Sequence, residues 1–144
     1  MSKSITDIVI TQGPSNMLNE DTNNCTVLAL SATCGLSYDG AYHIAKECWN
    51  RVRTKGVRLS SLIKYFKDIR TTQVDTINEY HTKWNDKVVK CKMNLSTFSK
   101  RYPEGNYYVV VGNHALAVID GKIIDHSSNL GRTRRIVKYA WKIK

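Results

Sequence analysis

The chain has 144 residues, 42% of them hydrophobic, which is enough to bury a core and excludes wholesale disorder. Its 22 Lys and Arg against 12 Asp and Glu give a net charge of +10, which is compatible with a polyanionic partner such as nucleic acid but is more often a solubilising or steering charge. The first ten residues lack the apolar core of a signal peptide, and no apolar run approaches the ~18 residues that span a bilayer. We therefore expect a cytoplasmic protein with reduced thiols and no membrane partner.

The N-terminal part of the chain predicts an arm followed by a buried helix. Residues 1–24 are polar and indicate a short strand or arm and then a loop. Residues 25–34 are apolar nearly all round, as is typical of a helix inside a domain. Asn24 is suited to be the N-cap of this helix, and Gly35 is suited to end it.

Two further helices complete the helical part, residues 25–69. Residues 38–52, with Ser37 as N-cap, and residues 59–69 repeat apolar side chains at helical spacing, and this pattern places Cys48 on an apolar face. The segment 70–93 is the least readable, although Val88, Val89 and Cys91 favour a strand there.

The last part of the chain, residues 94–144, predicts mostly antiparallel sheet after a short helix near 96–101. The turn signals Gly112-Asn113 and Asp120-Gly121 separate short β-branched runs, a pattern that strongly favours hairpins. The predicted strands are 107–111, 115–119, 123–125 and 135–143. Because helices precede the strands, we expect an α+β fold in which N-terminal helices pack on a C-terminal antiparallel sheet.

Cys25 opens the first helix and is the candidate nucleophile. A helix N-terminus carries roughly half a positive charge, which favours thiolate over thiol. The thiolate is the nucleophile that covalent catalysis by cysteine requires. Polar residues 21–24 lead directly into Cys25, whereas Cys34 and Cys48 fall on apolar helical faces, where cysteine behaves as a small hydrophobe.

His114 begins a predicted strand and is the candidate base. If Asp120-Gly121 is a two-residue turn, counting outward pairs Leu116 with Asp125. Since side chains alternate between faces, His114 and Asp125 then share one face, with their backbones roughly 5.5–8 Å apart. Asp125 can accept a hydrogen bond from the imidazole and stabilise its charged form.

Two neighbouring residues are weaker candidates on the same register. His126 is expected on the opposite face of the hairpin, which makes it a poor base. Asp120 is explained by the turn itself.

The order Cys25, His114, Asp125 resembles that of papain-like cysteine peptidases, in which the cysteine opens a central helix and the histidine lies on an antiparallel sheet. The similarity is closest to bacteriocin-processing, double-glycine type peptidases and to small papain-like proteins of phages and bacteria. The segments that carry it are 24–30, 105–111 and 112–118, followed by Asp120-Gly121 and Asp125. The local signature of papain around its cysteine is absent.

This resemblance implies a single papain-like domain over residues 1–144, of phage origin and acting in the host cytoplasm. It implies a peptidase that cleaves peptide or isopeptide bonds of a protein or peptide substrate, without a metal or organic cofactor. His114 would activate Cys25 and then protonate the leaving group. The family usually has a Gln about six residues before the cysteine to bind the oxyanion. Here Asn19 stands at that position, with an amide one methylene shorter.

Three other functions remain open from the sequence. An inactive papain-like fold that binds a host or viral protein is compatible with Asn19 in place of Gln. A basic nucleic-acid-binding protein would use the excess Lys and Arg together with some of the eight Tyr. An acyltransferase or transglutaminase would use the same three residues and differ only in its product.

Overall fold

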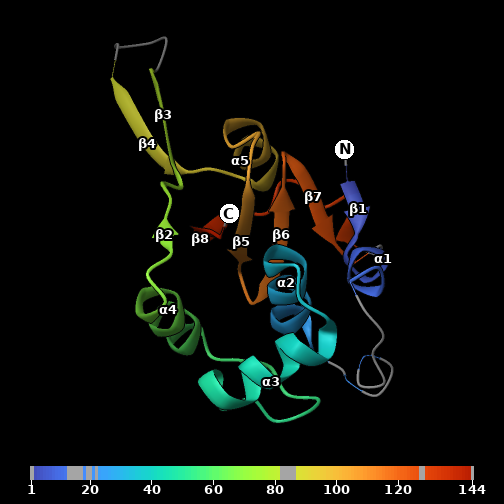
Figure 1. Ribbon diagram of the computed structural model, residues 1–144. Helices are drawn as coiled ribbons and strands as arrows, with labels where there is room; N and C mark the ends of the chain where they lie inside the picture. The colour runs from blue at the N-terminus through green and yellow to red at the C-terminus, as the bar shows by residue number, and fades with distance from the viewer. Residues whose placement is uncertain are drawn as a thin grey trace.

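A computed structural model describes residues 2–12, 18, 21, 23–81, 87–126 and 129–143 (Figure 1). The helices are α1 (Ile5–Ile10), α2 (Cys25–Cys34), α3 (Tyr38–Trp49), α4 (Leu59–Asp68) and α5 (Leu95–Arg101). The strands are β1 (Ser2–Ser4), β2 (Thr72–Gln73), β3 (Ile77–His81), β4 (Val88–Lys92), β5 (Asn106–Val111), β6 (His114–Ile119), β7 (Lys122–Asp125) and β8 (Val137–Lys142). The protein is a mixed helix and sheet structure, in agreement with the α+β prediction.

The main sheet has the strand order β1-β7-β6-β5-β8-β2. Its strands pair antiparallel except for β1, which runs parallel to β7 at one edge. Strands β3 and β4 form a separate two-stranded ribbon that projects from the body (Figure 1). The sequence predicted the antiparallel meander, the β4 strand and a short strand or arm near the N-terminus, but neither the parallel pairing of β1 with β7 nor the helix α1.

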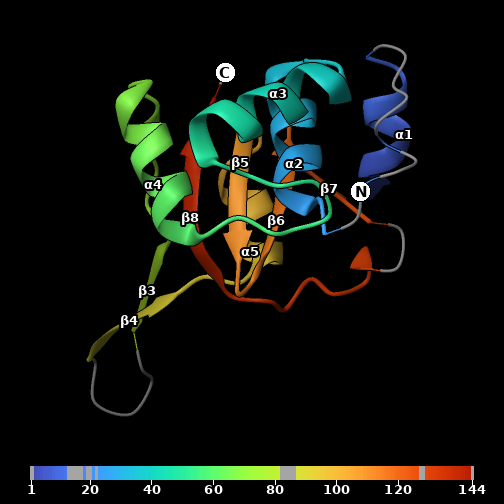
Figure 2. The same ribbon diagram turned by 90° about the horizontal axis from the view of Figure 1, so that it is seen from below.

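The sheet carries a buried layer on each face, and β5 shows why. Tyr108 and Val110 pack with the core of α1 to α4, whereas Tyr107, Val109 and Val111 pack with the core around α5. This alternation is the period of two that a strand imposes. The continuous apolar run of β5 is therefore the signature of a strand that is covered on both sides. Figure 2 shows α2, α3 and α4 gathered on one side of the sheet.

Helix α2 is the central element of the larger core. Its residues from Thr26 to Thr33 are buried, and it packs against α1, α3, β5 and β6. Gly35 ends it in the left-handed conformation with φ 69°, as the sequence predicted. Because α2 lies across β5 and β6, its first residue is brought to the end of the sheet where β6 begins.

The buried face of α3 differs from the one that the sequence predicted. Its buried residues are Tyr38, Ala41, Ala45 and Trp49, while Cys48 is exposed. The aromatic ends Tyr38 and Trp49 bury more apolar area than a thiol, so they rotate the helix and turn Cys48 outward. The helix also ends at Trp49, before residue 52, because Asn50 is left-handed with φ 52°. The Ser37 cap is confirmed, since its Oγ accepts from the Gly40 N–H at 3.1 Å.

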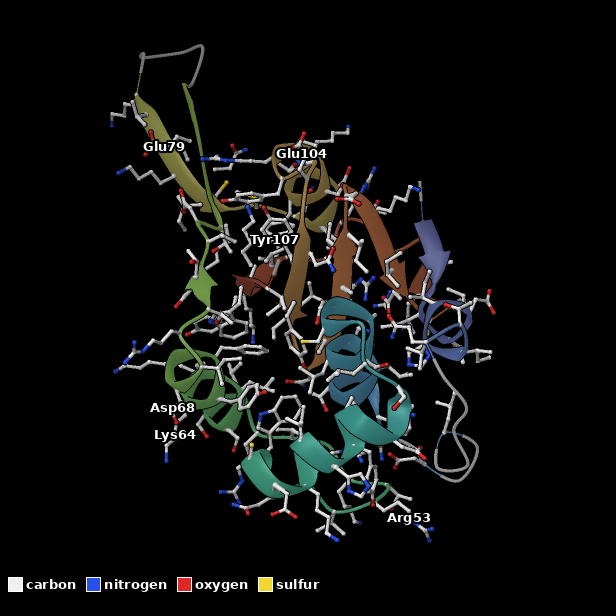
Figure 3. The ribbon with its side chains drawn as sticks, in the orientation of Figure 1. Arg53, Lys64, Asp68, Glu79, Glu104 and Tyr107 are labelled. Carbon is white, nitrogen blue, oxygen red and sulfur yellow. The ribbon has the colours of Figure 1, made fainter. Side chains whose placement is uncertain are left out.

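Outside the core the molecule is charged. On α4, Lys64 and Asp68 point away from the sheet (Figure 3). Within the described residues, none of the helices is long and apolar enough to cross a bilayer.

Candidate active site

Cys25 is the first residue of α2 and is partly buried at the end of the sheet. Asn24 precedes it as the N-cap, but the side chain of Asn24 makes no capping hydrogen bond. Its Nδ2 instead donates to the hydroxyl oxygen of Tyr38 at 3.2 Å, so Asn24 is the N-cap residue as predicted but does not cap through its side chain. This contact ties the residue before Cys25 to α3.

A buried ion pair holds the segment that leads into Cys25. The Arg51 guanidinium binds Asp21 with both ends, Nη1 to Oδ2 at 2.8 Å and Nη2 to Oδ1 at 3.0 Å. The Tyr38 hydroxyl and the Thr54 N–H also donate to this carboxylate. Burial raises the pKa of Asp21, but these donors, Arg51 first, more than offset that effect and lower it. Figure 2 shows the segment between α3 and α4 running beside the start of α2.

The β6–β7 hairpin has the predicted register. Ile119 pairs with Lys122 and Ala117 pairs with Ile124. Asp120 and Gly121 form the turn with φ values of 49° and 75°, the positive angles that a tight hairpin turn requires. The hairpin brings His114 Nε2 to 2.6 Å from Asp125 Oδ1.

Asp125 is fully buried and accepts three hydrogen bonds. Oδ1 takes the His114 ring and the His126 N–H at 2.7 Å, and Oδ2 takes Arg135 Nη2 at 2.8 Å. Burial alone would raise the pKa of Asp125, but these donors outweigh burial and lower it. Asp125 is therefore an anion that holds the imidazole at one nitrogen.

Sequence reasoning missed Arg135 at this site. Its Nε donates to the Arg132 carbonyl at 2.6 Å, which aims the guanidinium at Asp125. In the sequence it belongs to a cluster of arginines and gives no sign of a buried partner. Strand register could not find it, because Arg135 precedes β8, in the connection that follows β7.

Cys25 and His114 form the second contact of the site. Because Nε2 faces Asp125, Nδ1 is the nitrogen left for the sulfur. Burial raises the pKa of Cys25, but hydrogen bonds from His114 and from the backbone of Ala115 and Thr26 bring it below its ordinary value. Burial likewise opposes charge on His114, yet Asp125 and Cys25 together raise its pKa to about 9. The lowered pKa of Cys25 and the raised pKa of His114 both favour a thiolate beside an imidazolium at neutral pH.

The pair opens into a cleft of about 560 Å³ that reaches solvent. The described lining residues are Asn23, Asn24, Cys25, Gly56, Asn113, His114, His126 and Asn129. The His126 ring lies in this cleft with its centroid 6.0 Å from that of His114, so its expected place on the opposite face is wrong. Alternation of faces fails there because β7 ends at Asp125 and the chain turns.

Asn19, the predicted oxyanion donor, lies outside the described residues. Among the residues that the structure does describe, no group of three or more His, Cys, Asp or Glu side chains is placed to hold a metal ion.

The two aspartates of the hairpin provide a matched test of the site. We expect Asp125→Ala to lower the rate of Cys25 alkylation at pH 6 about 10- to 100-fold, because the imidazole loses its orienting carboxylate. Asp120→Gly keeps the left-handed turn and should change that rate less than twofold. Mass spectrometry of the alkylated protein gives both rates, and equal losses would place the orienting carboxylate elsewhere. A melting curve for each variant separates a local effect from unfolding.

No family model, no curated protein and no solved structure matches this chain.

Proposed function

We propose that the protein is a papain-like thiol hydrolase, a cysteine peptidase that acts on peptide or isopeptide bonds. The observation that carries the proposal is the position of His114 between the Cys25 thiol and the buried Asp125 carboxylate. A nucleophile, a base and a group that orients the base are the parts that nucleophilic catalysis requires. The open cleft around this pair leaves room for an extended chain.

The reaction follows from the charges of the pair. The Cys25 thiolate attacks the carbonyl carbon, and the oxyanion that forms takes a hydrogen bond from the Cys25 backbone N–H. His114 gives its proton to the leaving amine as the C–N bond breaks, which leaves a thioester on Cys25. Water then loses a proton to His114 and attacks the thioester, the C–S bond breaks, and the acid and the thiolate are released.

Activity should depend on pH in two limbs. Hydrolysis is expected to rise through the lowered pKa of Cys25, because the thiolate forms there, and to fall through about 9, where His114 loses the proton that the leaving amine needs. Alkylation of Cys25 by iodoacetamide should rise over the same acidic limb. It should not fall at about 9, since alkylation needs the thiolate alone.

Alkylation tests the proposal before any substrate is known. The native protein is treated with limiting iodoacetamide from pH 5 to 10, and each cysteine is followed by mass spectrometry. At pH 6 an ordinary thiol is only about one part in 300 thiolate, so fast labelling of Cys25 identifies an activated one. In His114→Ala the pH at which Cys25 labelling reaches half its maximum rate should rise towards that of an ordinary thiol. Labelling that instead follows exposure, with Cys48 and Cys91 ahead of Cys25, would overturn the proposal.

A further inference from the structure

A second pocket lies beside the cleft and is lined by cations. It measures about 540 Å³ and shares Asn113, His114 and Asn129 with the cleft that contains Cys25. The charged residues of its described lining are Arg132, Arg135 and Lys138, and none of these lining residues is acidic. The two cavities therefore adjoin at His114, and a molecule bound at Cys25 can extend into this pocket.

The three cations are not equivalent. Arg135 is half-buried and its charge is already matched by Asp125 at 2.8 Å. Arg132 and Lys138 are exposed, and no acidic side chain of the described residues pairs with either. Two charges of one sign held close together in a concave site repel each other and attract an anion.

Exposed acidic side chains of the described residues, such as Glu104 and Glu79, lie away from this pocket. Glu104 precedes β5, whereas the pocket is at the other end of that strand, and Glu79 is on the projecting ribbon (Figure 3). Among the described residues the acid beside the pocket is Asp125, which is buried and already paired with His114 and Arg135. The described residues therefore supply no carboxylate to Arg132 and Lys138, and a bound anion can pair with both.

An apolar pocket adjoins the basic one. It measures about 300 Å³, is walled by Val57, Leu59, Leu62 and Val110, and shares His114 and Lys138 with the basic pocket. Val110 and Val111 point to opposite faces of β5, so the two pockets meet across the β5–β6 turn. Thr26 Oγ1 is buried at the apolar pocket, and no described atom is its hydrogen-bond partner.

We propose, on the basis of the proposed function, that the cleft selects protein segments in which an acidic side chain neighbours an apolar one. Arg132 and Lys138 bind the carboxylate, and the apolar side chain occupies the pocket of Val57, Leu59 and Leu62. A protein segment is favoured over RNA because the apolar pocket suits an apolar side chain. The net charge of +10 then steers acidic substrates to the cleft.

Protection of Cys25 from alkylation tests this specificity, because it requires binding and not turnover. The probes are three pools of six-residue peptides with a central Leu-Asp, Leu-Asn or Leu-Lys pair in both orders. We expect the Asp pool to protect Cys25 at about tenfold lower concentration than the Asn pool, and the Lys pool to protect least. The advantage of the Asp pool should shrink as salt rises.

Charge reversal decides whether the named cations cause the preference. Lys138→Glu combined with Arg132→Gln should abolish the Asp preference and make the Lys pool the best protector. The control, Lys64→Gln with Lys67→Gln, removes two exposed cations from α4 and should leave the order unchanged. An Asp preference that survives the reversal, or equal protection by all three pools, would overturn the inference.

The failure of the inference and that of the proposed function are distinguishable. Slow labelling of Cys25 at pH 6 in the unliganded protein counts against the hydrolase. The order of the pools can still be measured in that case, because at pH 8.5 even an ordinary thiol is partly ionised and is alkylated. If a single-stranded RNA protects Cys25 better than every pool, with a steep salt dependence that the reversal removes, the pocket binds nucleic acid and the inference is wrong.

Discussion

Cys25→Ala is expected to abolish covalent labelling by a peptide epoxide and to lower hydrolysis on the order of 10⁴-fold or more, while the protein stays folded. The sulfur is the only atom removed from the Cys25–His114–Asp125 arrangement. His114 keeps its hydrogen bond to Asp125 at 2.6 Å, so the hairpin is not disturbed. Because Cys25 is only partly buried, the cavity left by the sulfur is small and the melting temperature should change by a few degrees at most.

The other three cysteines are controls for this result. Cys48 and Cys91 are more exposed than Cys25, so simple access would label them first. Cys48→Ser and Cys91→Ser should leave both labelling of Cys25 and stability unchanged. Cys34→Ser, at a partly buried position of α2, should cost some stability without loss of activity. Full epoxide labelling in Cys25→Ala, or loss of activity in Cys34→Ser at an unchanged melting temperature, would mean that the nucleophile is misassigned.

The contact between His114 and Asp125 was predictable because it depends on local rules alone. A turn of Asp120-Gly121 fixes the register of the hairpin, and the register fixes which side chains share a face. The position of Cys25 was similarly predictable from the polar segment that precedes an apolar helix. In both cases the deciding neighbours are close in sequence, so the pattern contains the information.

The rest of the site depends on contacts between distant segments, and the sequence did not reveal it. Asp21 and Arg51 form an ion pair over 30 positions of the chain, and Arg135 reaches Asp125 from the connection before β8. His126 turns into the cleft because a strand ends, which alternation alone cannot anticipate. Each of these residues looks like an ordinary surface charge until the tertiary structure buries it or brings it to the cleft.

The largest effect on stability is expected from Arg51→Met. Breaking a buried ion pair by removing one partner costs about 3–5 kcal/mol, because the remaining charge is left without compensation. Arg51 and Asp21 are 4% and 8% exposed, so solvent can do little to replace the lost partner. For a chain of this size we expect the melting temperature to fall by roughly 10 °C. Lys55→Ala, an exposed cation on the same segment, should have almost no effect.

The dependence of this loss on pH identifies its cause. Arg51 is the foremost of the groups that lower the pKa of Asp21 in the native protein. The ionised Asp21 therefore stabilises the native state at pH values above its unfolded pKa of about 3.9, and this stabilisation is lost as the pH falls through the lowered native pKa. In Arg51→Met the carboxylate loses its guanidinium partner and keeps the weaker donors Tyr38 and Thr54, so its pKa rises and protonation relieves part of the penalty. The variant should therefore lose most stability at pH 7 and clearly less at pH 4, as measured by urea unfolding at both values.

The double variant Asp21→Asn with Arg51→Met completes the cycle. If the buried charge is the source of the loss, removing it as well should recover part of the stability that Arg51→Met alone gives up. If the stability losses of the two single variants simply add in the double variant, or if Arg51→Met loses the same stability at pH 4 and pH 7, then Arg51 stabilises the protein through packing and not through its charge. Since Asp21 also accepts from Thr54 and Tyr38, this carboxylate holds both the segment before Cys25 and the one that contributes Gly56 to the cleft. Slower alkylation of Cys25 in Arg51→Met, at a temperature where the variant is still folded, is therefore the expected functional consequence.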